Sequence, residues 1–512
     1  MERIDESPLT AEEKANLDLL KITDKGLLTG VTDKEKLAGS LVLPDSITVI
    51  ASTAFADCTS LTSVVIPNSV TKIEWSAFFC CTSLTSVLIP DAVSEIGWEA
   101  FFGCTSLTRI VIPAHVTELG GRAFGSCTGL IHLSVDPANT IYYSENNIIY
   151  TKDKKTLLAA AAGLTGRIDI LESVTVISAD AFADCNSLTS VEVPNTSIKI
   201  EDRAFSGCTG LSSVEIPDSV TEIGESAFQN CSALTSVIVS HNITTIDEEL
   251  FSGCISLKSI VIPDNVIAIG WAAFYGCTSL TTVIIPASVT EIDAQAFYGC
   301  RNIIHLTIDP ANNMYCSENN IIYTKDKKRL VAVVGDLKGC FTICNTVAAV
   351  GAEAFSGCIG LTSIVIPDSI TEIGEGAFAD CSALQRVIIS ESVTKIADRT
   401  FSLCSSLTHA VIPENVTEID REAFYGCISL TTVVIPNTVT AIEWAAFSGC
   451  TSLKNITILN SIITIGNGAF EDINPDAHFT VSSESVKELL LNSGSNIRDE
   501  QITVDMNLYI TC

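Results

Sequence analysis

The 512-residue chain has little positive charge, few aromatic side chains and no long apolar run. Its 29 Lys and Arg are outnumbered by 60 Asp and Glu, which gives a net charge of -31. Nucleic acid is excluded as a partner, because a phosphate backbone is held by lysine and arginine side chains. The longest apolar stretch, residues 157–164, is far shorter than the roughly 20 residues that span a bilayer, so membrane insertion is excluded as well.

The chain also lacks an export signal and the usual catalytic motifs. It opens MERIDESPLTAEEKANLDLL, which is polar and acidic where a secretory signal has a basic start and an apolar stretch. No phosphate-binding loop, dinucleotide-binding motif or zinc-protease motif is present. His132, His305 and His409 share one repeat position, but no serine and carboxylate set accompanies them. The sequence therefore predicts a protein that is not an enzyme, with no cofactor and no metal.

What the chain does contain is a repeat of 23 residues, marked by a Phe with a Cys three places later. The repeat phenylalanines are Phe55, Phe78, Phe101, Phe124, Phe182, Phe205, Phe228, Phe251, Phe274, Phe297, Phe355, Phe378, Phe401, Phe424, Phe447 and Phe470. Only the last of these sixteen lacks its cysteine. A single unit of this length cannot bury its own Phe, so we expect the coils to stack around one continuous core.

Each repeat predicts a strand after the cysteine and a turn after the strand. In the first unit the strand spacing resembles that of a leucine-rich repeat, with Leu61, Val64 and Ile66 pointing inward. A turn follows at residues 67–70, and a short second segment around Ile73 closes the coil. The predicted fold class is an α/β leucine-rich repeat solenoid of about 16 repeats, with a parallel β-sheet on its concave face.

Two interruptions break the period. At two places the spacing of the repeat phenylalanines grows from 23 to 58 residues, and both interruptions contain the sequence SENNIIYTKDKK, 173 residues apart. A DPAN motif, at Asp136 and at Asp309, precedes each copy. We infer that a block of several repeats was duplicated. Each insert, about residues 134–168 and 307–341, is predicted to form a β-hairpin that projects from the coil.

The two ends differ from the repeats, as the caps of a solenoid must. We expect an N-terminal cap over residues 1–40, in which Thr10 and Glu13 form the capping box of a short helix. The solenoid would run over residues 41–470. A C-terminal cap over residues 471–512 would contain a strand at 479–481, a helix at 486–491 and a strand at 502–504.

The fifteen cysteines of the repeat column are predicted to form a reduced, buried packing ladder. Free cysteine behaves as a small hydrophobe, and the parallel Cβ vectors of stacked coils do not suit a disulfide. A tetrahedral metal site needs four ligands, whereas close cysteine pairs in this chain offer only two thiols. The cysteines outside the ladder are expected to be the more reactive thiols: Cys80, Cys316, Cys340, Cys344 and Cys512.

Binding is expected on the outward column, the strand position between the two inward residues. Its fifteen members are the twelve residues expected to bind, Val65, Leu88, Val111, Glu192, Glu215, Ile238, Val261, Ile284, Val365, Ile388, Val411 and Val434, together with Ser134, Thr307 and Thr457. Ten of them are Val, Leu or Ile, and an exposed apolar stripe on a protein surface typically marks an interaction site. The alternative is β-propensity alone, since β-branched residues suit any pleated sheet.

Three further features carry weaker hypotheses. All four tryptophans lie three residues before a repeat Phe: Trp75, Trp98, Trp271 and Trp444. They could bind a ligand, but we favour packing over the adjacent coil. The only basic clusters lie in the inserts, at residues 152–155 and 325–329, where solvated turns that protect a hairpin edge are favoured over a site for an acidic partner. Each DPAN loop offers one carboxylate, too few for calcium.

The recurring pattern, of which IPDSVTEIGESAFQNC at residues 216–231 is one copy, is similar to that of the BspA-like leucine-rich repeat family over about residues 40–470. The resemblance implies a secreted or cell-surface protein of host-associated microbes, a surface antigen that adheres to extracellular matrix or host-cell proteins. It implies protein ligands and no catalytic residues. Because no export signal is visible, an intracellular protein-interaction scaffold is the alternative.

Overall fold

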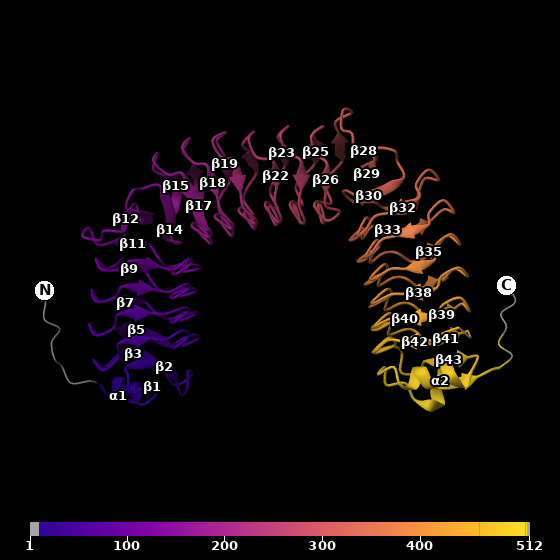
Figure 1. Cartoon of the computed structure of the whole chain (residues 1–512), viewed down its shortest axis with the longest axis horizontal. Helices are drawn as coiled ribbons and strands as arrows, with labels where there is room; N and C mark the ends of the chain where they lie inside the picture. Colours follow the sequence, from indigo (N-terminus) through magenta and orange to yellow (C-terminus); the bar gives the residue numbers. More distant parts are fainter. Residues whose placement is uncertain (1–9, 460, 507, 509–512) are drawn as a thin grey trace. The chain divides into compact units, whose positions relative to one another are not determined.

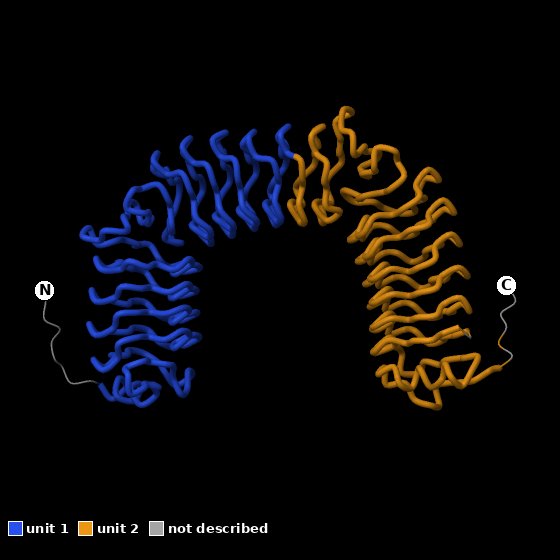
Figure 2. The backbone as a smooth tube through the Cα atoms, in the orientation of Figure 1, with its two compact units in different colours: residues 1–266 blue, residues 267–512 orange. Residues whose placement is uncertain are grey.

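The computed structural model describes residues 10–459, 461–506 and 508, and the chain divides into two compact units, residues 1–266 and 267–512 (Figures 1 and 2). Each unit is a solenoid of short coils. A coil contains one longer strand, a turn, a two-residue strand and a run of turns that carries the repeat Phe and Cys. The predicted solenoid of parallel strands is confirmed in both units.

In unit 1 the longer strands of neighbouring repeats pair in parallel. Ser190, for example, pairs with Ser213, which lies 23 residues later in the next repeat. They are β3 (Gly39–Val42), β5 (Leu61–Val65), β7 (Ser86–Leu88), β9 (Arg109–Ile112), β11 (His132–Val135), β15 (Thr165–Asp169), β17 (Ser187–Glu192), β19 (Ser213–Glu215), β21 (Ser236–Ile238) and β23 (Ser259–Val261). The second strands are β2 (Leu27–Val31), β4 (Val49–Ile50), β6 (Lys72–Ile73), β8 (Glu95–Ile96), β10 (Glu118–Leu119), β16 (Val176–Ile177), β18 (Lys199–Ile200), β20 (Glu222–Ile223) and β22 (Thr245–Ile246). Strand β1 (Leu20–Ile22) precedes them and pairs antiparallel with β2.

Unit 2 repeats this arrangement. Its longer strands are β25 (Thr282–Ile285), β27 (His305–Ile308), β31 (Gly339–Thr342), β33 (Leu361–Val365), β35 (Arg386–Ile388), β37 (His409–Ala410), β39 (Thr432–Ile435), β41 (Asn455–Ile458), β43 (His478–Val481) and β44 (Ile502–Val504). The second strands are β24 (Ala268–Ile269), β26 (Glu291–Ile292), β32 (Ala349–Val350), β34 (Glu372–Ile373), β36 (Lys395–Ile396), β38 (Glu418–Ile419), β40 (Ala441–Ile442) and β42 (Thr464–Ile465). The longer strands from β31 to β44 form one eight-stranded sheet.

Local hydrogen bonds explain why the repeat closes into a coil. The Val70 N–H donates to the Pro67 carbonyl at 3.1 Å, which makes the predicted turn at residues 67–70. Ser76 lies two positions before Phe78 and Cys80 two positions after it. Both have a positive φ, 51° and 55°, and they bend the chain around the ring. The Phe78 N–H then donates to the carbonyl of Ala100 in the next coil at 2.7 Å. Hydrogen bonds between coils therefore continue through the turns as well as the strands.

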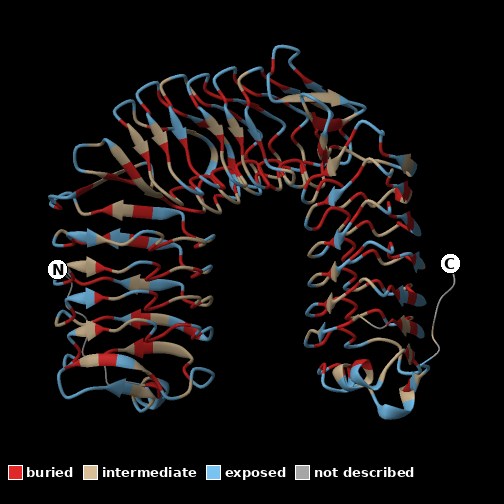
Figure 3. Cartoon of the chain, turned by 45° about the vertical axis from the view of Figure 1, so that its right-hand side comes forward, coloured by how far each residue is buried: buried red, intermediate tan, exposed pale blue. Residues whose placement is uncertain are grey.

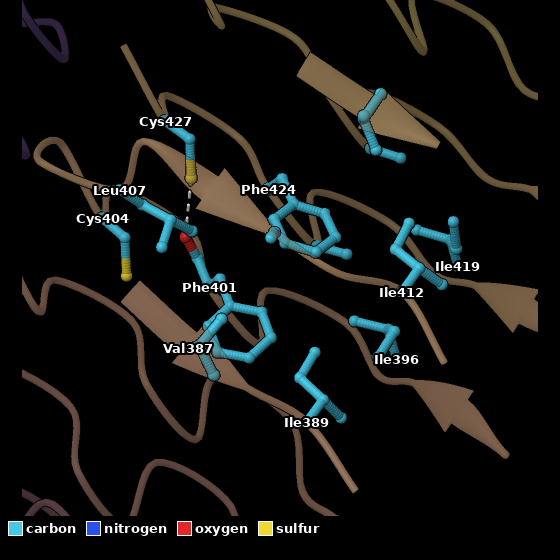
Figure 4. Close-up of a cluster of buried hydrophobic side chains, with 14 of the residues drawn as sticks. Val387, Ile389, Ile396, Phe401, Cys404, Leu407, Ile412, Ile419, Phe424 and Cys427 are labelled. Carbon is cyan, nitrogen blue, oxygen red and sulfur yellow. Dashed lines mark hydrogen bonds between the residues drawn. The ribbon is translucent and has the colours of Figure 1, made fainter. Parts of the chain in front are cut away.

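The core is a column of stacked phenylalanine rings inside each unit. Within a unit the centroids of successive repeat rings lie 5.0 to 5.9 Å apart, and most of the rings are fully buried. Figure 4 shows Phe401 and Phe424 stacked among the inward side chains of their coils. The predicted inward residues Leu61, Val64 and Ile66 are at most 4% exposed. Figure 3 shows the resulting contrast between buried interior and exposed strand faces.

The ends carry the helices of the described part of the chain. Helix α1 (Ala11–Leu17) begins with the predicted capping box, in which Thr10 and Glu13 exchange hydrogen bonds. Helix α2 (Glu484–Leu491) and the short 3₁₀ turn Asp499–Gln501 lie between β43 and β44, as the predicted strand, helix and strand order requires. Neither α-helix is long and apolar enough to cross a lipid bilayer.

Each insert contains the predicted hairpin and one additional strand. In unit 1 the hairpin pairs β13 (Ile148–Thr151) with β14 (Thr156–Ala160), and β12 (Tyr142–Glu145) adds to β13. In unit 2 the equivalent strands are β28 (Tyr315–Glu318), β29 (Ile321–Thr324) and β30 (Arg329–Val333). Strand β14 pairs in parallel with β16, and β30 with β32. Each insert thus also supplies the first strand of a new run of second strands.

Candidate protein-binding surface

The outward column lies on the exposed face of the longer strands in both units. Its ten apolar members range from 36% exposed at Val365 to 79% at Val261. In unit 1 Leu88 is 65% exposed, and in unit 2 Val411 is 70% exposed. Several exposed apolar side chains of this size on neighbouring strands form a patch that is uncommon on a protein surface without a partner. Each unit therefore presents its own apolar stripe.

Part of each stripe lies in a groove. In unit 1 the groove has a volume of about 640 Å³, and Val65 and Leu88 line it together with Pro67 and Pro90 from the following turns. Asp45 and Asp91 stand at its rim. Volumes of this order accommodate several side chains of a ligand.

The groove of unit 2 has a different rim. Its volume is about 710 Å³, with Ile388 and Val411 among its lining residues. Arg386, Glu391 and His409 also line it, so both signs of charge meet there. These rim residues escaped the sequence prediction, although the Pro-Asp or Pro-Asn pair that follows many strands was a usable signal in unit 1.

Glu192 and Glu215 interrupt the stripe of unit 1, as their charge predicts. The two residues are cross-strand neighbours in β17 and β19, and both are exposed. The guanidinium of Arg167 in β15 lies 2.6 Å from a carboxylate oxygen of Glu192 and partly offsets the repulsion between the two carboxylates. This part of the column is polar and separates the apolar positions on either side.

The cysteine column is buried, and its thiols are hydrogen-bonded. The Cys81 thiol donates to the Phe55 carbonyl at 3.1 Å, and Cys231 bonds Phe205 in the same way at 3.2 Å. Burial raises the pKa of Cys58 to about 12, so its thiol stays protonated at neutral pH. Figure 4 shows one such bond, from Cys427 to the carbonyl of Phe401. The ladder is a packing element of the core.

The cysteines outside the ladder are more accessible. Cys340 and Cys344 are exposed, whereas Cys80 and Cys316 are half-buried. A hydrogen bond from the Thr346 hydroxyl lowers the pKa of the Cys344 thiol. Cys512 lies outside the described residues. Across the described ranges no three His, Cys, Asp or Glu side chains are grouped as metal ligands.

Three of the four tryptophans, Trp75, Trp98 and Trp271, contact side chains of neighbouring coils, which is the packing favoured from the sequence. The rings of Trp75 and Trp98 stack with centroids 6.4 Å apart, and the Arg122 guanidinium lies 6.0 Å from the Trp98 ring. The Trp271 indole N–H donates to Gln295 at 2.8 Å. Each of the four is still 44% to 48% exposed.

Most of the basic side chains of the inserts have partners within the same unit. The Lys154 ammonium lies 3.9 Å from the centre of the Tyr143 ring. Lys327 pairs with Glu318 at 2.7 Å, and Arg329 pairs with Glu372 at 2.7 Å. In the second insert two of the basic side chains, Lys327 and Arg329, are thus already paired with carboxylates of the chain.

The DPAN loops are held together by their asparagine. Asn139 is 1% exposed, and its amide donates to the carbonyls of Pro113 and Val116 at 2.9 Å. Its own oxygen accepts from the N–H groups of Ile141 and Tyr142. Asn312 makes the equivalent bonds in unit 2. The motif therefore has a structural explanation that needs no bound cation.

The histidines of the strand column lie on the exposed sheet face without catalytic partners. His132 and His305 begin β11 and β27, and the ring of His409 contacts the Thr408 hydroxyl at 3.0 Å. Within the described part of the chain, none of the three lies in an ion pair with a carboxylate.

The chain was compared with known proteins. A family model for the BspA-type leucine-rich repeat region matches residues 34–151, 175–304, 244–321, 339–443 and 417–499. A solved leucine-rich repeat protein of Eubacterium ventriosum is similar, with 25% identity and a TM-score of 0.51 over 57% of this chain and 89% of that one.

Two other solved structures are also similar to this chain. A leucine-rich cell-surface protein of Faecalibacterium prausnitzii has 26% identity and a TM-score of 0.45, over 86% of this chain and 92% of that one. The pneumococcal vaccine antigen PcpA has 17% identity and a TM-score of 0.39, over 95% and 96% of the two chains. No curated protein matches the sequence. Because the family model covers most of the repeats, the chain belongs to the BspA-type leucine-rich repeat family.

Proposed function

We propose that this chain is a non-enzymatic adhesion protein of the cell surface that binds extracellular-matrix or host-cell proteins through the outward column. The observation that carries the proposal is the exposed apolar stripe with a groove in each unit. β-propensity explains a preference for valine and isoleucine, but it does not explain why Val65, Leu88, Ile388 and Val411 of the stripe line grooves of several hundred Å³.

The two grooves favour different ligand side chains. The unit 1 groove, with Asp45 and Asp91 beside Val65 and Leu88, suits an apolar side chain next to a basic one. The unit 2 groove, with Arg386 and Glu391 at its edge, suits a neutral or mixed segment. A large ligand that contacts several coils would add many weak contacts into useful affinity.

The test is binding of the full chain to a panel of immobilised extracellular-matrix proteins. Val261→Lys and Val411→Lys place a charge on the two most exposed members of the stripe. We expect each change to weaken binding by about tenfold or more, because a lysine cannot enter an apolar contact without losing its hydration. Folding should be unaffected, since neither side chain is buried.

Matched controls exist on another face. Ile198 and Ile463 are 53% and 70% exposed, and neither lies in a longer strand. Ile198→Lys and Ile463→Lys make the same chemical change away from the stripe and should leave binding unchanged. Equal loss in both pairs, or no loss in either, would remove the outward column as the binding surface.

An intracellular scaffold is the second candidate, and the free thiols favour it. The exposed cysteines Cys340 and Cys344 and the buried Cys58 are free thiols, as is usual for proteins of a reducing compartment. Treatment of intact source cells with protease separates the two. Digestion of this chain while a cytosolic control survives supports the surface protein, and protection until lysis supports the scaffold.

A further inference from the structure

Three strands of the chain begin a run of longer strands in the same way. They are β3 and β15 in unit 1 and β31 in unit 2. Each has a glycine of positive φ at its first or second residue, 68° at Gly39 and 76° at both Gly166 and Gly339, followed by a register shift against the next strand. Each therefore has a neighbour on one side only, and the other side is a sheet edge.

The backbone groups on the β31 edge can be assigned from its hydrogen bonds. Ile343 donates its N–H to the Val365 carbonyl at 3.2 Å, so it faces β33. Because successive residues of a strand direct their N–H and C=O groups to opposite neighbours, Phe341 also faces β33, and Cys340 and Thr342 face the open edge. In the part of the chain that the structure describes, no group pairs with Cys340 or Thr342 on that side.

The equivalent edge of β3 is covered. The side-chain amide of Asn16 in α1 donates to the carbonyls of Ala38 and Ser40 at 2.7 and 2.8 Å. Ser40 occupies the position of Cys340, since each pairs with the serine of the following strand. Glu12 of the same helix lies against Gly39. Around Gly339, by contrast, the space that a Cβ would occupy has no atom within 4 Å.

The equivalent edge of β15 is open but charged. Arg167 and Asp169 stand at the positions of Cys340 and Thr342, and they form an ion pair at 2.8 Å. Charged side chains on an edge strand oppose the addition of another strand, because pairing would remove them from water. Strand β31 carries a thiol and a hydroxyl at these positions and has no such protection.

A cleft of about 440 Å³ lies next to the start of β31. Its lining includes Ile304, which is 65% exposed, and Leu337. Lys338 in the lining is paired with Asp336 at 3.0 Å. The exposed guanidinium of Arg301, also in the lining, has no carboxylate within ion-pair distance among the described residues. The first copy carries the uncharged residues Thr128, Gly163 and Thr165 where the second has Arg301, Asp336 and Lys338.

We propose that the open edge of β31 binds an extended segment of a partner protein as an added β-strand. The N–H and C=O groups of Cys340 and Thr342 would pair with the backbone of that segment, which is recognition by strand addition. An acidic side chain of the segment would meet Arg301, and an apolar one would cover Ile304 in the cleft. This site adjoins the outward column of the proposed function, because Thr342 pairs with Val365, but it binds through backbone groups of the strand edge and not through the exposed side chains of the column.

The test is selection of a displayed library of random twelve-residue peptides on the full chain. The decisive variant is Thr342→Pro, which removes one N–H of the open edge. Proline is tolerated on an edge strand when its missing N–H would face solvent, so we expect the variant to melt as the unchanged chain does. Peptides selected on the unchanged chain should bind Thr342→Pro about tenfold more weakly or worse.

Two controls define the site. Asp169→Pro makes the same backbone change at the duplicated edge of β15 and should leave peptide binding unchanged. Thr342→Val removes the hydroxyl but keeps the N–H, so this variant should also bind the selected peptides. Arg301→Glu should shift the selected peptides from acidic to basic residues at one end. Equal affinity of the selected peptides for Thr342→Pro and the unchanged chain would overturn the proposal.

Two further outcomes are informative. Hydrogen exchange tests the edge without any substitution: the amides of Cys340 and Thr342 should exchange rapidly in the free chain and slow when a selected peptide is bound. Slow exchange in the free chain would mean that the edge is already paired and would refute the proposal. Concentration-dependent dimers that Thr342→Pro abolishes would assign the edge to a second copy of this chain instead.

Discussion

The two inserts are copies of one sequence, and comparing them separates what the fold requires from what has diverged. In both copies an asparagine and a serine from the insert satisfy the edge of the preceding strand. Asn147 accepts from the Leu133 N–H in unit 1, and Asn320 accepts from the Leu306 N–H at 2.9 Å in unit 2. The serine bonds, to Val135 and Ile308, are likewise the same.

The residues that differ lie around the strand that follows the insert. Arg167, Asp169 and Leu171 of the first copy are Cys340, Thr342 and Cys344 in the second. None of these side chains fills the core, so substitution there leaves the packing intact. In both copies the insert therefore ends one run of longer strands by the same hydrogen bonds. The strand that begins the next run, β15 or β31, carries different side chains on its edge, because these side chains lie outside the core.

The largest expected effect falls on a core position that both copies share. Phe228 and Phe401 occupy equivalent places in the duplicated blocks, and both are fully buried. Phe228→Ala and Phe401→Ala should each lower the free energy of unfolding by about 4 kcal/mol, through lost burial and the remaining cavity. Chemical denaturation measures both. A difference of several kcal/mol between them would show that the copies do not share one packing scheme.

A smaller effect is expected at the buried asparagines of the DPAN loops. Asn139→Ala and Asn312→Ala would each remove four hydrogen bonds, two donated by the side-chain amide and two accepted by its oxygen, and should destabilise the chain by about 3 kcal/mol. Thr140→Ala, at an exposed neighbouring position, is the control and should change little. An unchanged melting temperature in either asparagine variant would contradict the structural role assigned to that copy.

The smallest effect concerns the thiols and depends on pH. Burial, followed by the nearby Asp336 charge, raises the pKa of Cys358 in the second copy to about 12. An unfolded cysteine loses its proton near pH 8.5, so the contribution of Cys358 to stability is complete below that pH and is lost as the pH rises toward 12. The free energy of unfolding of the unchanged chain should fall as the pH rises from about 9 to about 11. In Cys358→Ala this fall should be smaller by about 1.4 kcal/mol per pH unit, because the titrating thiol is absent.

Cys344→Ala serves as the control for the titration. Its thiol is exposed, and its hydrogen bond to Thr346 lowers the pKa, so it adds nothing to the alkaline loss of stability. Cys344 should also react with iodoacetamide at neutral pH well before any ladder cysteine. Faster alkylation of Cys358 in the native chain would show that the ladder opens.

Much of the fold could be predicted because burial repeats with the sequence. The Phe and Cys column and the inward residues Leu61, Val64 and Ile66 follow directly from a 23-residue period, since each coil meets the same neighbours. The third strand of each insert was missed, because Tyr142–Glu145 is polar and its pairing depends on the hairpin beside it. The outward column was located by the same period, but its grooves were not.

The amino-acid sequence was sufficient to establish the repeat, the composition of the core and the duplication of the inserts, because these are regularities of side-chain size and polarity along the chain. Which strand edges are covered, charged or open depended on the tertiary structure. Asn16 lies more than twenty residues from the carbonyls it caps, and the open edge of β31 is defined by the absence of such a group among the described residues. Hydrogen-bond satisfaction at an edge is a matter of spatial neighbours, and no local pattern in the sequence records it.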